Sequence, residues 1–183
     1  RRAIRGLDAN LAFLRDQAAC RNPDRYKRAV HDIQRLLGQA GSGRNQRIGL
    51  AEYQDLSLSP VRSADLIQSA ETFHQNPFYS YFRQRLSPVV EQIGPSVIGL
   101  SINYLDQALC AFAMIGFFRK LYPRVRIILG GGLITAWLKR PGFKSPFTGL
   151  VDEMAAGPGE AALLGFVGKT VQIETTCPDY APF

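Results

Sequence analysis

The sequence has few residues of the kinds that build disulfide or metal sites. It contains three cysteines among 183 residues, and Cys20, Cys110 and Cys177 are too far apart for the usual spacing of metal ligands. Cys110 falls in an apolar stretch, where a free cysteine behaves as a small core residue. We therefore expect neither a disulfide framework nor a metal site, and we expect the chain to work in a reducing cytoplasm.

Histidine is also scarce, and the sequence shows no pattern typical of an active site. His31 and His74 fall on predicted helices without a catalytic partner near them in the chain, so we interpret them as surface or structural residues. There is no P-loop, no nucleophile elbow and no zinc pattern. We assign no catalytic residue, and whether the chain is an enzyme stays open.

Long apolar runs are absent as well. The longest, residues 108–118, is too short to span a bilayer, which takes about 20 residues. We interpret it as a buried helix, and we expect no membrane partner.

Positive charge is concentrated near the N-terminus. Residues 1–49 contain ten arginines and one lysine against four aspartates, which accounts for the net charge of +7. Asp16, Asp24 and Asp32 are interleaved with these basic side chains along two predicted helices. We interpret the pattern as a solvated helix face, with packing against another domain as an alternative; nucleic acid is not the partner we expect.

Helical patterns dominate residues 1–93, because apolar residues recur there at a spacing of three or four. Asn22 and Pro23 are typical of a helix start. We expect the glycine-rich residues 38–43 to end that helix, and Pro88 to bend or interrupt a later one. The predicted helices are 7–19, 23–37, 63–73 and 77–93, and residues 47–60 form an irregular or strand-like link.

After residue 94, short apolar runs alternate with helical patterns. Such runs are typical of strands buried on both faces of a parallel sheet, and their alternation with helices predicts βαβ units in an α/β fold. Asp106 is expected to cap the helix after the first strand. The predicted strands are 97–102, 125–129, 150–155 and 171–173, and the predicted helices are 106–121, 134–138 and 160–166.

Three loops follow the first three strands directly, at residues 101–105, 130–133 and 156–160. Because the carboxyl ends of parallel strands share one edge of the sheet, where ligands of such folds bind, we expect these loops to meet there. Two of them are rich in glycine, which lets a backbone approach a flat or phosphorylated ligand closely. The alternative is that these glycines only form tight turns between strands and helices.

Three side chains near these loops have two interpretations each. Asp152 could contact the ligand edge, and Trp137 and Phe143 could cover a ligand. We favour a structural role for Asp152, and packing in the core or at a domain interface for the two aromatic residues.

Three segments together resemble a known family. Residues 95–101 end in Gly-x-Ser, residues 127–132 end in a run of glycines, and Val151-Asp152 leads to a glycine-rich turn and helix at 157–163. This ordered combination resembles the B12-binding domain of cobalamin-dependent radical S-adenosylmethionine (SAM) proteins. Pro158 stands where that family usually has glutamate. The Asp-x-His-x-x-Gly motif, whose histidine ligates cobalt in a related branch, is absent.

The resemblance implies a Rossmann-like (flavodoxin-like) parallel sheet flanked by helices, with an N-terminal helical segment. Residues 1–93 would be this segment packed on the domain, 94–175 the B12-binding-type core, and 176–183 a linker. We therefore expect the chain to be a piece of a longer protein. Its partner would be a C-terminal radical SAM domain of the same parent chain, which holds a 4Fe-4S cluster and SAM.

By the same resemblance the chain binds cobalamin, and its parent is a B12-dependent radical SAM enzyme, a methyltransferase or a related enzyme. The chain has no Cys-x-x-x-Cys-x-x-Cys cluster motif, so we do not expect it to be catalytic alone. The alternative is a degenerate Rossmann-like domain that binds no corrinoid and serves as a docking or nucleotide-binding module. The cofactor-binding residues implied by the resemblance are Ser101, Ile102, Asn103, Tyr104, Gly130, Gly131, Gly132, Thr135, Gly157, Gly159 and Glu160.

Overall fold

The computed structural model describes residues 2–42, 45–157, 159 and 164–165. It is a mixed α/β structure with a three-stranded parallel sheet and helices packed against it. The predicted strand 171–173, most of the predicted helix 160–166 and the expected linker 176–183 lie outside the described residues. In the described part of the chain, no helix is both long and apolar enough to cross a membrane.

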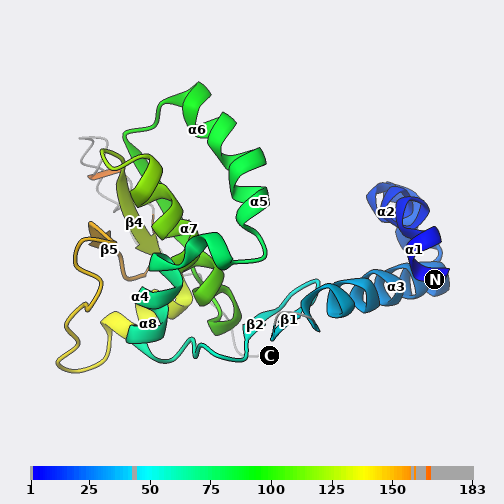
Figure 1. The fold of residues 1–183 in the computed structure, drawn as a ribbon, viewed down its shortest axis with the longest axis horizontal. Coiled ribbons are helices and arrows are strands. Elements are labelled where there is room, and N and C mark those ends of the chain that lie inside the picture. The colour runs from blue at the N-terminus through cyan, green and yellow to red at the C-terminus, as the bar shows by residue number, and fades with distance from the viewer. Residues whose placement is uncertain (1, 43–44, 158, 160–163, 166–183) are drawn as a thin grey trace, which may run out of the picture.

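The first helices form an arm that extends away from the rest of the molecule (Figure 1). The arm consists of α1 (Arg2–Arg5), α2 (Leu7–Arg15), a 3-10 turn (Gln17–Arg21) and the long α3 (Pro23–Ser42). The Asn22 side chain accepts a hydrogen bond from the Arg25 amide (3.1 Å), which confirms the predicted helix start. Helix α3 ends at Ser42, within the residues 38–43 expected to end it, although it runs through Gly38 and so beyond the predicted 23–37. A glycine inside a helix costs only about 1 kcal/mol, which the rest of α3 outweighs.

A short hairpin joins this arm to the body. Strands β1 (Gln46–Ile48) and β2 (Tyr53–Asp55) pair antiparallel, so the link expected at residues 47–60 contains regular structure. The buried ring of Tyr53 packs edge-on against Phe78, with 5.7 Å between the ring centroids. The hairpin is therefore anchored to the body by its inward face.

The stretch before the sheet is helical but interrupted. It comprises α4 (Ser63–Glu71), a 3-10 turn (Phe73–Gln75), α5 (Tyr79–Tyr81), a π-helical turn (Phe82–Leu86) and α6 (Ser87–Ile93). The interruption expected at Pro88 is the π-helical turn just before it. Proline has no N–H to donate and its ring collides with the carbonyl four residues earlier, so the preceding turn widens.

Strands β3 (Val97–Ser101), β4 (Arg126–Gly130) and β5 (Glu153–Met154) form the parallel sheet in that order. β3 and β4 lie where the sequence predicts strands. β5 is shorter than the predicted 150–155, although Asp152 and Ala155 each donate one backbone hydrogen bond to β4 (2.9 and 2.8 Å). β5, which leads to the last predicted loop, is therefore the shortest strand of the parallel sheet.

Helices α7 (Leu105–Leu121) and α8 (Gly132–Leu138) connect the strands. The predicted cap at Asp106 is wrong: Tyr104 is the N-cap residue, and the Gln107 side chain accepts the Asn103 amide at 2.8 Å. Helix α7 is apolar on every side because it lies between the sheet and α4 (Figure 1). Its partly buried Cys110 packs against the core as a free thiol. The fully buried core includes Leu66, Phe112, Ile115, Phe117, Ile127 and Leu129.

Helices α4 and α7 approach each other at a glycine. A Cβ atom on Gly116 would lie 1.8 Å from the Ala70 carbonyl oxygen, so only glycine fits this contact. Gly38 in α3 is also inside a helix, but a Cβ there would meet no atom within 4 Å. Alanine at position 116 therefore measures the cost of steric overlap, whereas alanine at position 38 measures the gain in helix propensity.

We predict opposite effects of alanine at these two positions. Gly116→Ala should lower the free energy of unfolding by about 1–3 kcal/mol, because the helices must move apart. Gly38→Ala should raise it by about 0.5–1 kcal/mol. Urea unfolding followed by circular dichroism measures both, and equal effects of the two variants would contradict this account of the α4–α7 contact.

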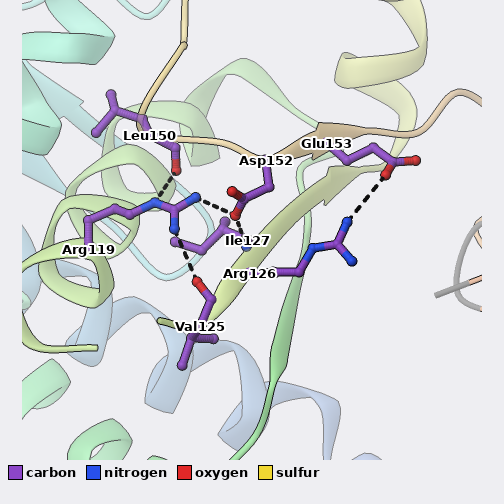
Figure 2. A network of polar contacts seen from close by, with 7 residues as sticks. All are labelled: Arg119, Val125, Arg126, Ile127, Leu150, Asp152 and Glu153. Atoms are coloured by element: carbon purple, nitrogen blue, oxygen red, sulfur yellow. Dashed lines mark hydrogen bonds and ion pairs between the residues drawn. The ribbon is translucent and has the colours of Figure 1, made fainter. Parts of the chain in front are cut away.

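Arg119, near the end of α7, holds the segment before β5 against the sheet (Figure 2). Its guanidinium donates to the carbonyls of Leu150 (2.8 Å) and Val125 (3.0 Å) and pairs with the Asp152 carboxylate. The same carboxylate accepts the Ile127 amide at 2.6 Å. Asp152 therefore has the structural role favoured from the sequence, and it faces away from the ligand edge.

We predict that Asp152→Asn lowers the free energy of unfolding at neutral pH by about 1–2 kcal/mol, because the charged hydrogen bonds to Arg119 and Ile127 are weakened. The expected loss is modest because the ion pair is partly exposed and solvent screens it. The matched control is Glu153→Gln. Its carboxylate lies 3.9 Å from Arg126 and both side chains are exposed, so about 0.5 kcal/mol or less should be lost. Chemical denaturation of the two variants is the measurement.

The contribution of Asp152 should also depend on pH. Burial alone would raise its pKa, but the hydrogen bonds from Ile127 and Arg119 outweigh it and lower the pKa below the ordinary 3.8. A group with a lowered folded pKa stabilises fully above its unfolded pKa, and this stabilisation disappears as pH falls through the folded value. The stability difference between the parent chain and Asp152→Asn should therefore shrink below pH 3.8.

Candidate functional site

A cavity of about 760 Å³ lies at the carboxyl ends of the three parallel strands. Ser101, Gly131 and Gly159 all line it, so the structure brings the three predicted loops together at one edge of the sheet. The described residues that line it are Gly99, Leu100, Ser101, Asn103, Ile128, Gly130, Gly131, Gly132, Thr135, Ala155, Gly157 and Gly159.

Several glycines in this lining face open space. A Cβ atom built on Gly99, Gly157 or Gly159 would have no heavy atom within 4 Å. Gly99 lies inside β3, where glycine weakens a strand and often marks a close approach by a ligand or another backbone. Packing within the described chain does not require glycine at this position.

Gly131 is different, because the turn itself requires it. Its φ is +103°, and a Cβ atom there would lie 2.5 Å from the Ile102 carbonyl oxygen. The two interpretations of the glycine-rich loops therefore apply to different residues: Gly131 makes a tight turn, whereas Gly99 leaves room in the cavity.

Side-chain hydrogen bonds tie the three loops to one another. The Asn103 side chain donates to Ser101 Oγ (3.3 Å) and accepts the Gly132 amide (2.9 Å). Thr135 Oγ1 accepts the Gly157 amide at 2.9 Å. The cavity wall is therefore preorganised by contacts between segments that are far apart in the sequence.

Two residues of the predicted set do not line the cavity, and a third is not described. Ile102 is 1% exposed and packs in the core, Tyr104 is 70% exposed, and Glu160 lies outside the described residues. Trp137 is buried 5.9 Å from the Phe147 ring, in agreement with the packing role favoured for it. Phe143 also packs against the core.

The sequence set missed Gly99, Leu100, Ile128 and Ala155. Gly99 and Ile128 could have been found from the strand period of two. Gly99 pairs with Ile128, and Ser101 pairs with Gly130. Alternate residues share a face, so these four positions form one face of the sheet. Ile98, Ile127 and Leu129 on the other face pack in the core.

Among the described residues, the cavity lining contains no charged side chain and no histidine. His31 and His74 are exposed elsewhere. The described residues also contain no group of three or more His, Cys, Asp or Glu side chains placed to hold a metal ion. No known family model, curated protein or solved structure matches this chain. Inferences about the cavity therefore come from its own geometry and chemistry.

We predict that Asn103→Ala loosens the cavity wall without unfolding the chain. The Gly132 amide loses its acceptor, which should cost about 1 kcal/mol. The Gly132 amide should also exchange with solvent faster. Hydrogen exchange followed by NMR is the measurement, and Tyr104→Phe at the exposed neighbour is the control that should leave the rate unchanged.

Proposed function

We propose that this chain is a Rossmann-like domain that binds a corrinoid cofactor, cobalamin, in the cavity at the carboxyl edge of its parallel sheet. The observation that supports this most strongly is the row of glycines that face open space there. Ligands of open α/β sheets bind at this edge, and the ordered motifs that resemble B12-binding domains supply the lining. In the same proposal, the parent protein carries a radical SAM domain with a 4Fe-4S cluster.

The size and charge of the cavity are compatible with this cofactor. A volume of about 760 Å³ falls in the range of roughly 300–1,000 Å³ typical of ligand sites. The described lining is uncharged and rich in bare backbone, which suits a ligand of low net charge. We infer that the nucleotide tail is the buried part and that the larger corrin ring lies over the open rim.

The residues would hold the cofactor by shape and by hydrogen bonds. Gly99 and Gly130 let the tail lie against the sheet, while Ser101 offers a hydroxyl and Thr135 closes the side nearest Gly157. No described residue of the lining could ligate cobalt. When bound, cobalamin supplies methyl-carrier or electron-transfer chemistry, and this chain contributes binding and orientation.

A polyphosphate nucleotide fits the described lining less well. A polyphosphate carries several negative charges that Lys or Arg side chains usually balance, and the described lining contains neither. The cobalamin tail carries a single phosphodiester. The uncharged wall therefore favours a corrinoid over ATP.

The test is reconstitution of the chain with hydroxocobalamin, followed by desalting and a visible spectrum. We expect a corrinoid spectrum at close to one equivalent, and weaker retention of cobinamide, which lacks the nucleotide tail. Parallel reconstitutions with FMN and ATP test the nucleotide alternative. Retention of either in place of the corrinoid, or of no ligand at all, would contradict the proposal.

We predict that Gly99→Val blocks this site while leaving the fold intact. A Cβ atom at this position would meet no heavy atom of the described residues within 4 Å. Because β-branched residues also favour strands, the midpoint of thermal unfolding should be unchanged or slightly raised. Corrinoid affinity should fall at least about tenfold because the cavity is filled. Ile98→Val, on the opposite face of the same strand, is the control and should bind like the parent chain in an absorbance titration.

A further inference from the structure

A second cavity, of about 440 Å³, lies between the β1–β2 hairpin and the α4 region. It shares no lining residue with the cavity at the sheet edge. Its wall combines Gln46 and Asp55 of the hairpin with Ser69 and Thr72 of the α4 segment. Because the two linings are separate, a ligand in this second cavity does not depend on the corrinoid proposal.

Gln46 presents a buried acceptor without a donor. Its Nε2 atom donates to Asp55 Oδ2 at 3.2 Å. A carboxylate only accepts, so the orientation of the amide is fixed. Gln46 is 8% exposed, and its Oε1 atom has no hydrogen-bond partner among the described residues. Buried acceptors of this kind are rare in folded proteins and call for a missing partner.

Asp55 places a fixed negative charge in the same wall. One carboxylate oxygen accepts both the amide and the hydroxyl of Ser57, each at 2.8 Å. Burial would raise the pKa of Asp55, but the hydrogen bonds from Ser57 and Gln46 outweigh it and lower the pKa. Burial first, and then the Asp55 charge, raise the pKa of Tyr53, so the phenol keeps its proton.

The hydroxyl groups of this wall also act as acceptors. Ser69 Oγ donates its proton to the Leu109 carbonyl (2.8 Å), and Thr72 Oγ1 donates to the Gln68 carbonyl (2.7 Å). A hydroxyl has one proton and two lone pairs, so both oxygens are left with lone pairs only.

We propose that this cavity binds a small organic cation through an ammonium or guanidinium group. The Asp55 carboxylate and the two hydroxyl oxygens have lone pairs open to further donors, and the Gln46 amide oxygen beside them has no donor among the described residues. Ammonium and guanidinium groups carry only donors. The single carboxylate matches one positive charge. A divalent metal fits less well, because the described residues contain no group of three or more typical metal ligands.

The experiment titrates the whole chain with methylguanidinium and n-propylammonium while the NMR signals are recorded. We expect saturable binding that shifts the Gln46 side-chain amide and the Thr72 backbone amide. The neutral analogue n-propanol, sodium and potassium should cause no saturable shift at the same concentrations. Equal binding of n-propanol or of an inorganic cation would overturn the proposal, as would the absence of saturable binding by both organic cations.

Two variants locate the site. Asp55→Asn removes the charge and should weaken binding by about tenfold or more. Thr72→Val removes one acceptor oxygen from α4 without touching the hairpin, so it tests the site even where Asp55→Asn unfolds the chain. Glu52→Gln, an exposed carboxylate in the turn of the same hairpin, is the matched control. If Glu52→Gln weakens binding as much as Thr72→Val does, the cation binds elsewhere and the proposal is wrong.

Discussion

The contact on which the sheet edge depends is the guanidinium of Arg119 against the segment before β5. β5 pairs over only two residues, and a strand that short adds little stability of its own. Arg119 bonds two carbonyls and one carboxylate, and the carboxylate in turn bonds β4. The network therefore joins α7, β4 and the segment before β5, and the third loop of the candidate site follows β5.

The two faces of the sheet show how one short motif serves both stability and binding. Ile98, Ile127 and Leu129 fill the core face. The other face has Gly99 beside Ile128 and Gly130 beside Ser101. Leaving a side chain off a strand forfeits packing and favours flexibility in the unfolded chain. The sheet tolerates this because its core face packs in one buried cluster with α7, and α4 packs against α7. The open face is the one with room for a ligand.

The sequence predicted the features that depend on local periodicity, which include β3, β4, α7 and the loops after each strand. It did not predict the hairpin well, because three-residue strands are too short for an alternation to be visible. The end of the long helix within residues 38–43 was predicted, but its passage through Gly38 was not, because the cost of one glycine is small over a long helix. The direction of the α1–α3 arm and the partners of Arg119 depend on contacts between distant segments, which one sequence does not encode visibly.

Helix α7 links the two cavities structurally, since it orders one wall of each. The Gln107 side chain in its first turn accepts a hydrogen bond from the Asn103 amide of the sheet-edge loop. The Leu109 carbonyl accepts a hydrogen bond from the Ser69 hydroxyl of the second cavity. The chemistry of the two walls differs nonetheless. The wall of the sheet-edge cavity is neutral and built from bare backbone. The wall of the second cavity has the fixed charge of Asp55 and two hydroxyl groups that already donate their protons to carbonyls. Because α7 orders both walls, each cavity would offer its proposed ligand groups that are in position before binding, so little conformational entropy would be lost on binding.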